Sequence, residues 1–378
     1  MLLIRNGFIH DMVRKDGYEG CVLIDGKKIV SVGERIDYPE DADVFDADGA
    51  DVYPGMIDAH SHLGLDIYGI GYEGDDYNEM NDPVCPQLRG IDSFNPLDRA
   101  VGMAARGGVT CVGTGPGSAN VLGGTFIAVK TAGRRVDDMV VKDPAAMKCA
   151  FGENPKRLYK NKNISARMTE AAMLREALLK ARDYMERKES GGDRKPPFDI
   201  KMESLIPVLK KQIPLKAHAH QANDILTAIR IAKELDVDLT LEHVTEGHLI
   251  ADELAEEGYP CAVGPSLCGA SKWELQNRDW ITPGVLASKG LQVSIITDAP
   301  VIPQEYLRLC AYYASAAGMD RYEALKAITI NAARHLGISD RTGSLEAGKD
   351  ADIVITSGNI IDPNTEIKKV IIDGREVD

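Results

Sequence analysis

One nine-residue stretch, 54–62, constrains the fold of this chain more than any other. It reads Pro-Gly-Met-Ile-Asp-Ala-His-Ser-His, an apolar segment that ends in two histidines one residue apart. Because alternate side chains of a β-strand point to the same face, His60 and His62 would lie side by side at the end of a strand. Neutral imidazole nitrogens are good ligands for zinc, iron and nickel, so the pair predicts a metal site. Two partly exposed histidines without a metal are the alternative for this motif taken alone.

From about Gly55 to Gly343, short apolar segments alternate with amphipathic ones. Counting the first strand, about eight strands are predicted, and helices with apolar residues three and four positions apart lie between them. This alternation predicts an α/β fold, a (β/α)8 TIM barrel, with a doubly wound open sheet as the alternative. The later strands are expected at 109–112, 126–129, 146–151, 215–219, 239–242, 260–263 and 292–297, and helices at 95–106, 169–188, 221–235, 249–257 and 321–336.

Both ends of the chain read as short strands separated by Asp-Gly turns. Residues 1–53 and 345–378 are each too small to bury a core, so we expect them to form one small β-sandwich beside a barrel of residues 54–344. The segment Gly69–Pro96 is rich in Gly, Asp, Asn and Pro and follows the first barrel strand, where barrels carry active-site loops. We expect a lid or substrate loop there, with a surface insertion as the alternative.

Charge and composition argue against several classes of partner. Lys and Arg number 44 against 58 Asp and Glu, which gives a net charge of −14, and no basic run is present. Nucleic acid and anionic membranes are therefore not expected as partners. No segment approaches transmembrane length and no signal-peptide pattern opens the chain, so we expect a cytoplasmic protein. The seven cysteines contain no Cys-x-x-Cys pair and are expected to be free thiols. A homo-oligomer is the default expectation.

More potential ligands occur where the predicted strands end. Residues 215–220 read Leu-Lys-Ala-His-Ala-His, the strand at 239–242 is followed by His243, and an apolar run ends at Asp298. An acidic residue at the end of a buried strand needs a partner. Because the carboxyl ends of barrel strands converge on one face, these residues are expected to meet the first histidine pair at a common point.

This ordered set resembles the amidohydrolase superfamily, in particular its imidazolonepropionase-like and prolidase-like enzymes. The resemblance rests on residues 52–62, on Gly-Gly-Val-Thr at 107–110 and on Gly-Ser-Leu-Glu-Ala-Gly-Lys-Asp-Ala-Asp at 343–352, where the chain leaves the barrel. It implies a (β/α)8 barrel flanked by a β-sandwich from both termini. It also implies a metal-dependent hydrolase with one or two divalent ions, zinc foremost, and iron, manganese or nickel as alternatives.

The resemblance assigns metal ligands at four strand ends. The matching residues are His60, His62, His218, His243 and Asp298. In the family, the eighth-strand aspartate also accepts a proton from the attacking water, and the metal or the sixth-strand histidine polarises the scissile carbonyl. Asp298 and His243 are therefore the candidate catalytic residues.

Two ligand assignments stay open. His218 is preferred over His220 as the fifth-strand ligand, and His220 would then contact substrate. For two ions, Glu153 is the first choice as a bridging ligand, because it closes an apolar strand and a carboxylate can bridge cations. It could instead cap the following turn. Lys148 and Lys130 are the alternatives, and either would need carbamylation.

The expected substrate is a small molecule with a scissile C–N bond. Superfamily deaminases tend to carry a glutamate three residues after the fifth-strand histidine; here Gln221 occupies this position. Hydrolysis of an amide, cyclic amide or dipeptide-like bond is favoured over deamination of a nitrogen heterocycle, and an inactive barrel that acts as a binding protein is a further alternative. Arg157 could bind a substrate carboxylate bidentately, with a solvated surface loop at 154–160 as the alternative. Asn120 ends a glycine-bearing pocket edge and is a candidate substrate contact.

Overall fold

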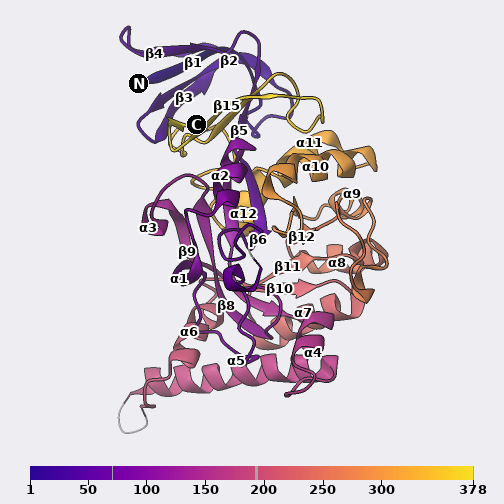
Figure 1. The fold of residues 1–378 in the computed structure, drawn as a ribbon. Coiled ribbons are helices and arrows are strands. Elements are labelled where there is room, and N and C mark those ends of the chain that lie inside the picture. Colours follow the sequence, from indigo (N-terminus) through magenta and orange to yellow (C-terminus); the bar gives the residue numbers. More distant parts are fainter. Residues whose placement is uncertain (70, 192–194, 378) are drawn as a thin grey trace.

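The computed structural model describes residues 1–69, 71–191 and 195–377, and its larger domain is built around an eight-stranded barrel sheet (Figure 1). Neighbouring strands in this sheet follow one another in the chain. Hydrogen bonds from Asp298 N to His60 O (3.2 Å) and from His62 N to Ala299 O (2.7 Å) join its two ends, so the barrel is nearly closed. Its strands are β6 (Met56–Ser61), β7 (Val109–Thr114), β8 (Leu122–Lys130), β9 (Val140–Ala150), β10 (Leu215–Ala219), β11 (Leu239–His243), β12 (Cys261–Val263) and β13 (Val293–Ile295).

Strand β8 departs from the expected (β/α)8 repeat. It pairs antiparallel with both β7 and β9, whereas the other neighbours in the sheet are parallel. The connections on either side of β8 are short, and a parallel crossover needs a dozen or more residues, usually with a helix. The strand was predicted in its correct place, but its direction was not. The carboxyl ends of the seven remaining strands still meet at one end of the barrel.

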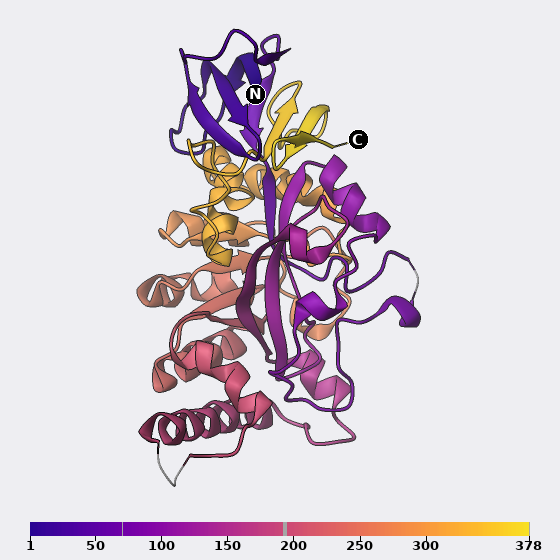
Figure 2. The same cartoon turned by 90° about the vertical axis from the view of Figure 1, so that its left-hand side faces the viewer.

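Helices cover the outside of the barrel (Figure 2). The predicted helices correspond to α2 (Arg99–Arg106), α5 (Arg167–Ser190), α7 (Ala222–Leu235) and α8 (Ala251–Glu257), while the predicted helix at 321–336 is divided into α11 (Arg321–Ala327) and α12 (Ile330–Leu336). The division falls at Thr329, whose ψ of −102° is not helical. The other helices are α1 (Gly90–Ser93), α3 (Val136–Met139), α4 (Glu153–Leu158), α6 (Ile200–Leu209), α9 (Thr282–Ser288) and α10 (Leu307–Ala316).

Strands from both ends of the chain form a second sheet at one end of the barrel (Figure 1). Strand β5 pairs antiparallel with β14, which joins the N-terminal strands to the C-terminal ones. The sandwich arrangement and the domain boundaries at 53/54 and 344/345 stay predictions. The strands of this sheet are β1 (Leu2–Ile9), β2 (Tyr18–Asp25), β3 (Lys28–Gly33), β4 (Asp43–Asp46), β5 (Asp51–Pro54), β14 (Ile353–Thr356), β15 (Ile367–Ile372) and β16 (Arg375–Glu376).

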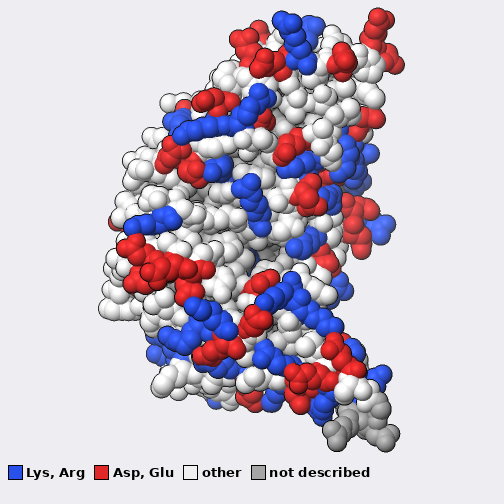
Figure 3. Space-filling model, turned by 180° about the vertical axis from the view of Figure 1, so that it is seen from behind, with Lys and Arg blue, Asp and Glu red and all other residues white. Residues whose placement is uncertain are grey.

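The surface in Figure 3 carries lysine and arginine side chains interspersed with aspartate and glutamate, without a broad area of one sign. The seven cysteines are free, as predicted. Within the described ranges, every helix is too short or too polar to cross a membrane.

Gly55, the residue before β6, packs directly against Thr110 of β7. A Cβ atom at Gly55 would lie 2.1 Å from Thr110 Oγ1 and 2.4 Å from its Cγ2. We therefore expect Gly55→Ala to lower the free energy of unfolding by roughly 1–3 kcal/mol, because the buried threonine has no room to move. Urea denaturation measures this effect against Gly269→Ala, whose Cβ would meet nothing within 4 Å. Equal midpoints for the two variants would contradict the expectation.

Candidate metal centre

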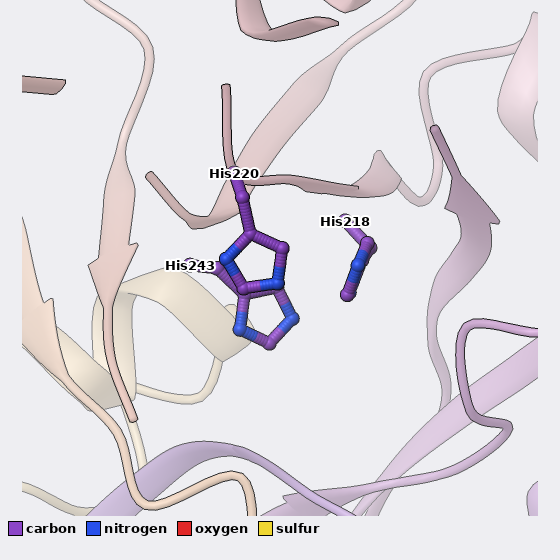
Figure 4. A group of neighbouring side chains, drawn as sticks. All are labelled: His218, His220 and His243. Carbon is purple, nitrogen blue, oxygen red and sulfur yellow. The ribbon is translucent and has the colours of Figure 1, made fainter. Parts of the chain in front are cut away.

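The carboxyl ends of β6, β10 and β11 and the segment after β13 bring buried histidines and an aspartate together. Two groups of side chains place one ligand atom each within 4.8 Å of the others. The first is His218, His220 and His243, whose rings gather in Figure 4. The second is His60, His243 and Asp298, so His243 belongs to both. His62 joins the second group, because its Nε2 lies 3.3 Å from Asp298 Oδ1.

Hydrogen bonds to the far nitrogen orient these rings toward the centre. His62 Nδ1 donates to Gly115 O at 2.8 Å, and His243 Nδ1 donates to Gly264 O at 2.8 Å. An acceptor on Nδ1 fixes the proton there and leaves Nε2 as a lone-pair donor, as in metal-ligating histidines. His220 Nδ1 lies 2.7 Å from Thr245 Oγ1, which leaves its Nε2 facing the group in the same way.

Several polar atoms at the centre are buried without a hydrogen-bond partner among the described residues. They are both ring nitrogens of His218, Nε2 of His243 and Oδ1 of Asp298. A buried polar atom without a partner is costly, so such a set fits a cation that satisfies several atoms at once. Burial lowers the pKa of His243 to about 4 and that of His218 well below its usual value. The rings are therefore neutral at pH 7, which is the form that binds metal.

The two candidate catalytic residues have unusual backbone conformations. His243 has a φ of 73° and Asp298 a φ of 53°, in the left-handed region. Non-glycine residues there cost free energy and cluster at functional sites. Each residue stands where its strand ends, and this turn places its side chain at the centre rather than along the strand.

Lys148 of β9 reaches the centre at the ring nitrogen of His60 that faces Asp298. Its side chain is fully buried, and Nζ lies 3.0 Å from His60 Nε2. Burial lowers the pKa of this lysine to about 8. Lys130, the other lysine considered from the sequence, is remote from the centre: its ammonium is buried in ion pairs with Asp350 at 3.1 Å and with Asp352.

Glu153 lies outside both groups of described residues that could hold a metal ion. The backbone turns at Gly152, whose φ is 98°, and Glu153 then begins α4 instead of continuing β9. Glu153 N donates to Glu274 Oε2 at 2.9 Å, and Glu274 N donates to Glu153 Oε2 at 3.4 Å. These bonds join the start of α4 to the segment of Glu274, and the role of Glu153 as a bridging ligand stays a prediction.

Glu242 is a buried contact of the centre that the sequence reasoning did not assign. Its Oε2 accepts from His60 Nδ1 and from Lys216 Nζ, each at 2.8 Å. Its Oε1 accepts from Thr240 Oγ1 and pairs with His335 Nε2, also at 2.8 Å. The carboxylate therefore fixes the orientation of the His60 ring. The signal was present in the sequence, because a charged residue inside an apolar strand requires a buried partner.

Asp58 ties β6 to the segment that carries Asp298. Its Oδ1 accepts from His60 N at 3.1 Å. Its Oδ2 accepts from Thr297 N at 3.1 Å and from Gln304 Nε2 at 2.7 Å. Burial raises the pKa of this carboxyl to about 7. Asp58 stands within the motif at 54–62, and its role in joining these two segments depends on contacts that are distant in the sequence.

A cavity of about 320 Å³ opens beside the centre. Two of the predicted substrate contacts, His220 and Arg157, line it. Tyr77 lines it as well, and its ring centroid lies 4.8 Å from that of His62. Tyr77 belongs to the predicted lid segment 69–96, of which residue 70 lies outside the described residues. This segment therefore packs against the candidate centre.

Asn120 anchors the lid segment and is not among the residues that line the cavity. Its side-chain amide donates to Glu79 O and to Asp82 O, each at 2.8 Å. A buried side-chain amide needs hydrogen-bond acceptors, and the lid backbone supplies carbonyl groups that are not used in a strand or a helix. A direct contact between Asn120 and substrate stays a prediction.

A barrel whose strand ends gather histidines and an aspartate is the architecture of barrel hydrolases with a metal centre at this face. The chain belongs to the amidohydrolase family, whose model matches residues 52–377.

Individual relatives agree with this family. The chain is 29% identical over 389 residues to the amidohydrolase tasK of Hapsidospora irregularis, covering 94% of this chain but 39% of that protein. Dihydroorotase of Streptococcus thermophilus is 47% identical over 63 residues, which are 17% of this chain and 15% of that one. The chain thus spans less than half the length of tasK.

Two solved structures extend the comparison. A crystal structure of an amidohydrolase from Thermotoga maritima MSB8 superposes with a TM-score of 0.96 at 42% identity and covers 100% of both chains. A prolidase complexed with N-methylphosphonate-L-proline has a TM-score of 0.60 at 17% identity and covers 100% of this chain and 99% of that one. At 17% identity, the similarity to the prolidase shows a shared fold alone.

Proposed function

We propose that this hydrolase is metal-dependent and cleaves a C–N bond of an amide, cyclic amide or dipeptide-like substrate. The observation that carries the proposal is the set of neutral, buried ring nitrogens, without a hydrogen-bond partner in the described part of the chain, beside an aspartate at one end of the barrel. A binding protein without catalytic function would have no need of such atoms, and their burial costs stability.

We infer that two divalent ions, most simply zinc, bind at the centre. His60, His62 and Asp298 would hold one ion. His218 and His243 would hold the other, with His220 within reach of the same position. The donor set of imidazoles and a carboxylate suits zinc and other borderline transition metals.

Lys148 is our candidate for a shared ligand between the two ions. Its lowered pKa increases the fraction of neutral amine, and only the neutral amine reacts with carbon dioxide to form a carbamate. The resulting carboxylate would stand beside His60, where the Nζ atom now lies 3.0 Å from the ring.

A divalent ion at such a centre lowers the pKa of water and polarises a carbonyl oxygen. Asp298 would accept a proton from the attacking water, a role supported by its Oδ1 atom, which has no hydrogen-bond partner among the described residues. The same carboxyl would return the proton to the leaving nitrogen. His243, which belongs to both groups of side chains, would polarise the scissile carbonyl, and the lid residue Tyr77 would limit access of bulk water to the cavity.

Hydrolysis of an amide is favoured over deamination by the position of Gln221. Its Oε1 accepts from Arg167 Nη2 at 2.5 Å, and the side chain is not among those that line the cavity. No proton donor for a heterocyclic ring nitrogen is thus available from this position. The relatives named dihydroorotase and prolidase are consistent with a C–N bond as the target.

The test is a hydrolysis screen with protein loaded with zinc and with the same protein after chelation. We expect the loaded protein to hydrolyse at least one member of a panel of N-acyl amino acids, dipeptides and cyclic amides. The chelated protein should lose this activity and regain it on zinc addition. Release of ammonia from purines or pyrimidines without amide cleavage would favour the deaminase, and activity that survives complete metal removal would overturn the proposal.

A further inference from the structure

Two cationic side chains line the cavity beside the candidate centre. Arg157 belongs to α4, which follows β9, and is exposed at the rim. Lys272 belongs to the loop between β12 and the short 3-10 helix η4 (Trp273–Leu275). These segments are far apart in the sequence, yet both residues line the same cavity. The family assignment and the proposed hydrolysis leave the role of Lys272 open.

A buried carboxylate holds the lysine in place. Glu274 is completely buried, and its Oε1 lies 2.7 Å from Lys272 Nζ, whose side chain is 18% exposed. A lysine ammonium has three N–H donors, so one ion pair leaves others for a ligand. Lys272 lines the cavity and Glu274 does not, so an incoming ligand meets the ammonium.

The same glutamate fixes the loop of Lys272 to the helix of Arg157. Glu153 N donates to Glu274 Oε2 at 2.9 Å, and Glu274 N donates to Glu153 Oε2 at 3.4 Å. This reciprocal pair joins the start of α4, which ends near Arg157, to η4. Both cations are therefore held on elements that are attached to each other, and this reduces the ordering cost of binding one anion with both.

Acidic and basic side chains line different ends of the cavity. Asp66 lines the cavity near the first strand, and its backbone N–H donates to His62 O at 3.0 Å. Asp298 lines the cavity beside the same histidine. Lys272 lies instead near the fifth-strand histidines, since its partner Glu274 is 3.7 Å from His220 Nε2. An anionic group is repelled at the first end and attracted at the second.

We propose that the substrate carries a carboxylate, and that Lys272 and Arg157 bind it while Glu274 positions the lysine. N-acyl amino acids and the carboxyl-terminal residue of a dipeptide have this chemistry. The inference rests on the proposed function, because it names the substrate class of the same centre. Lys272 would thus determine specificity, and the clamp between Glu274 and Glu153 would fix where the carboxylate stands relative to the scissile bond.

Kinetics of matched substrates tests the inference. Wild type should prefer N-acyl amino acids over the same compounds with a carboxyl-terminal amide. Lys272→Met and Arg157→Met should each raise KM for the carboxylate substrate by roughly 10–100-fold, the usual effect of losing a charge-assisted hydrogen bond, with little change for the amide. Lys272→Arg should restore part of the preference. Lys160→Met, an exposed residue just after α4, is the control and should match wild type.

A binding measurement tests the carboxylate site separately from the proposed hydrolysis. Calorimetric titration of the zinc-loaded protein with N-acetylglycine and with N-acetylglycinamide should show at least about tenfold tighter binding of the carboxylate, lost in Lys272→Met. Equal affinities, or a preference that persists in Lys272→Met because the metal binds the anion, would overturn the inference. Carboxylate-selective binding without hydrolysis of any amide would overturn the proposed function alone.

Discussion

Replacement of Asp298 by asparagine is expected to lower kcat by roughly 10²–10⁴-fold, the usual contribution of a general base. Asparagine keeps the size of the side chain but cannot accept and return a proton at pH 7. The carboxylate lies 3.3 Å from His62 Nε2 and 3.6 Å from His60 Nε2, so the variant should also bind its metal more weakly. Initial rates on the best substrate of the hydrolysis screen, at saturating zinc, measure the catalytic part of the effect.

The control for this variant is Asp75→Asn, an exposed acid on the lid segment. It changes the net charge equally and should retain the rate of wild type within about twofold, as is usual for surface substitutions. Metal analysis and near-ultraviolet circular dichroism of both variants establish whether the centre and the fold are intact. Activity of Asp298→Asn within tenfold of wild type, with metal bound, would exclude the aspartate as the base.

Replacement of Lys148 by methionine is expected to weaken metal binding by roughly 100-fold or more, at the upper end of what loss of a supporting partner costs. Methionine fills a similar volume, so the buried position should not leave a cavity. If a carbamate forms on this lysine, metal uptake by wild type should also depend on bicarbonate. Zinc content after dialysis with and without bicarbonate, and carbon-13 spectroscopy with labelled bicarbonate, measure both effects.

Lys142→Met is the matched control, because Lys142 lies on the same strand but is only partly buried and does not contact the centre. It should take up zinc as wild type does. Undiminished zinc binding by Lys148→Met would show that the lysine is no ligand. Zinc uptake by wild type that does not depend on bicarbonate would exclude the carbamate. The zinc content of Lys148→Met would then test whether the amine itself binds the metal.

The positions of the strands could be predicted from the sequence because apolar periodicity is a local signal. The direction of β8 could not, since it depends on which neighbours the strand pairs with and on the length of the connections. Similarly, the predicted helix at 321–336 has a continuous apolar pattern, and only the packed structure reveals the break at Thr329.

The candidate centre, too, could be predicted from the sequence only in part. Histidines at strand ends could be assigned from the sequence, because barrel topology brings all such ends to one face. The surroundings of Lys148 and Glu153 could not, although each stands near the end of β9. Lys148 lies inside the strand and contacts His60, whereas the chain turns at Gly152, whose φ is 98°, and Glu153 begins a helix.

The sequence by itself determined the alternation of strands and helices and the residues that could ligate a metal, because spacing along one strand decides which side chains share a face. Only the tertiary structure decided which residues from different strands meet. The contacts between His60 and Glu242, between Lys148 and His60, and between Lys272 and Glu274 are of this kind. The first two connect strands that are not neighbours in the barrel, and distances across a barrel depend on the closure of the whole sheet rather than on any local pattern.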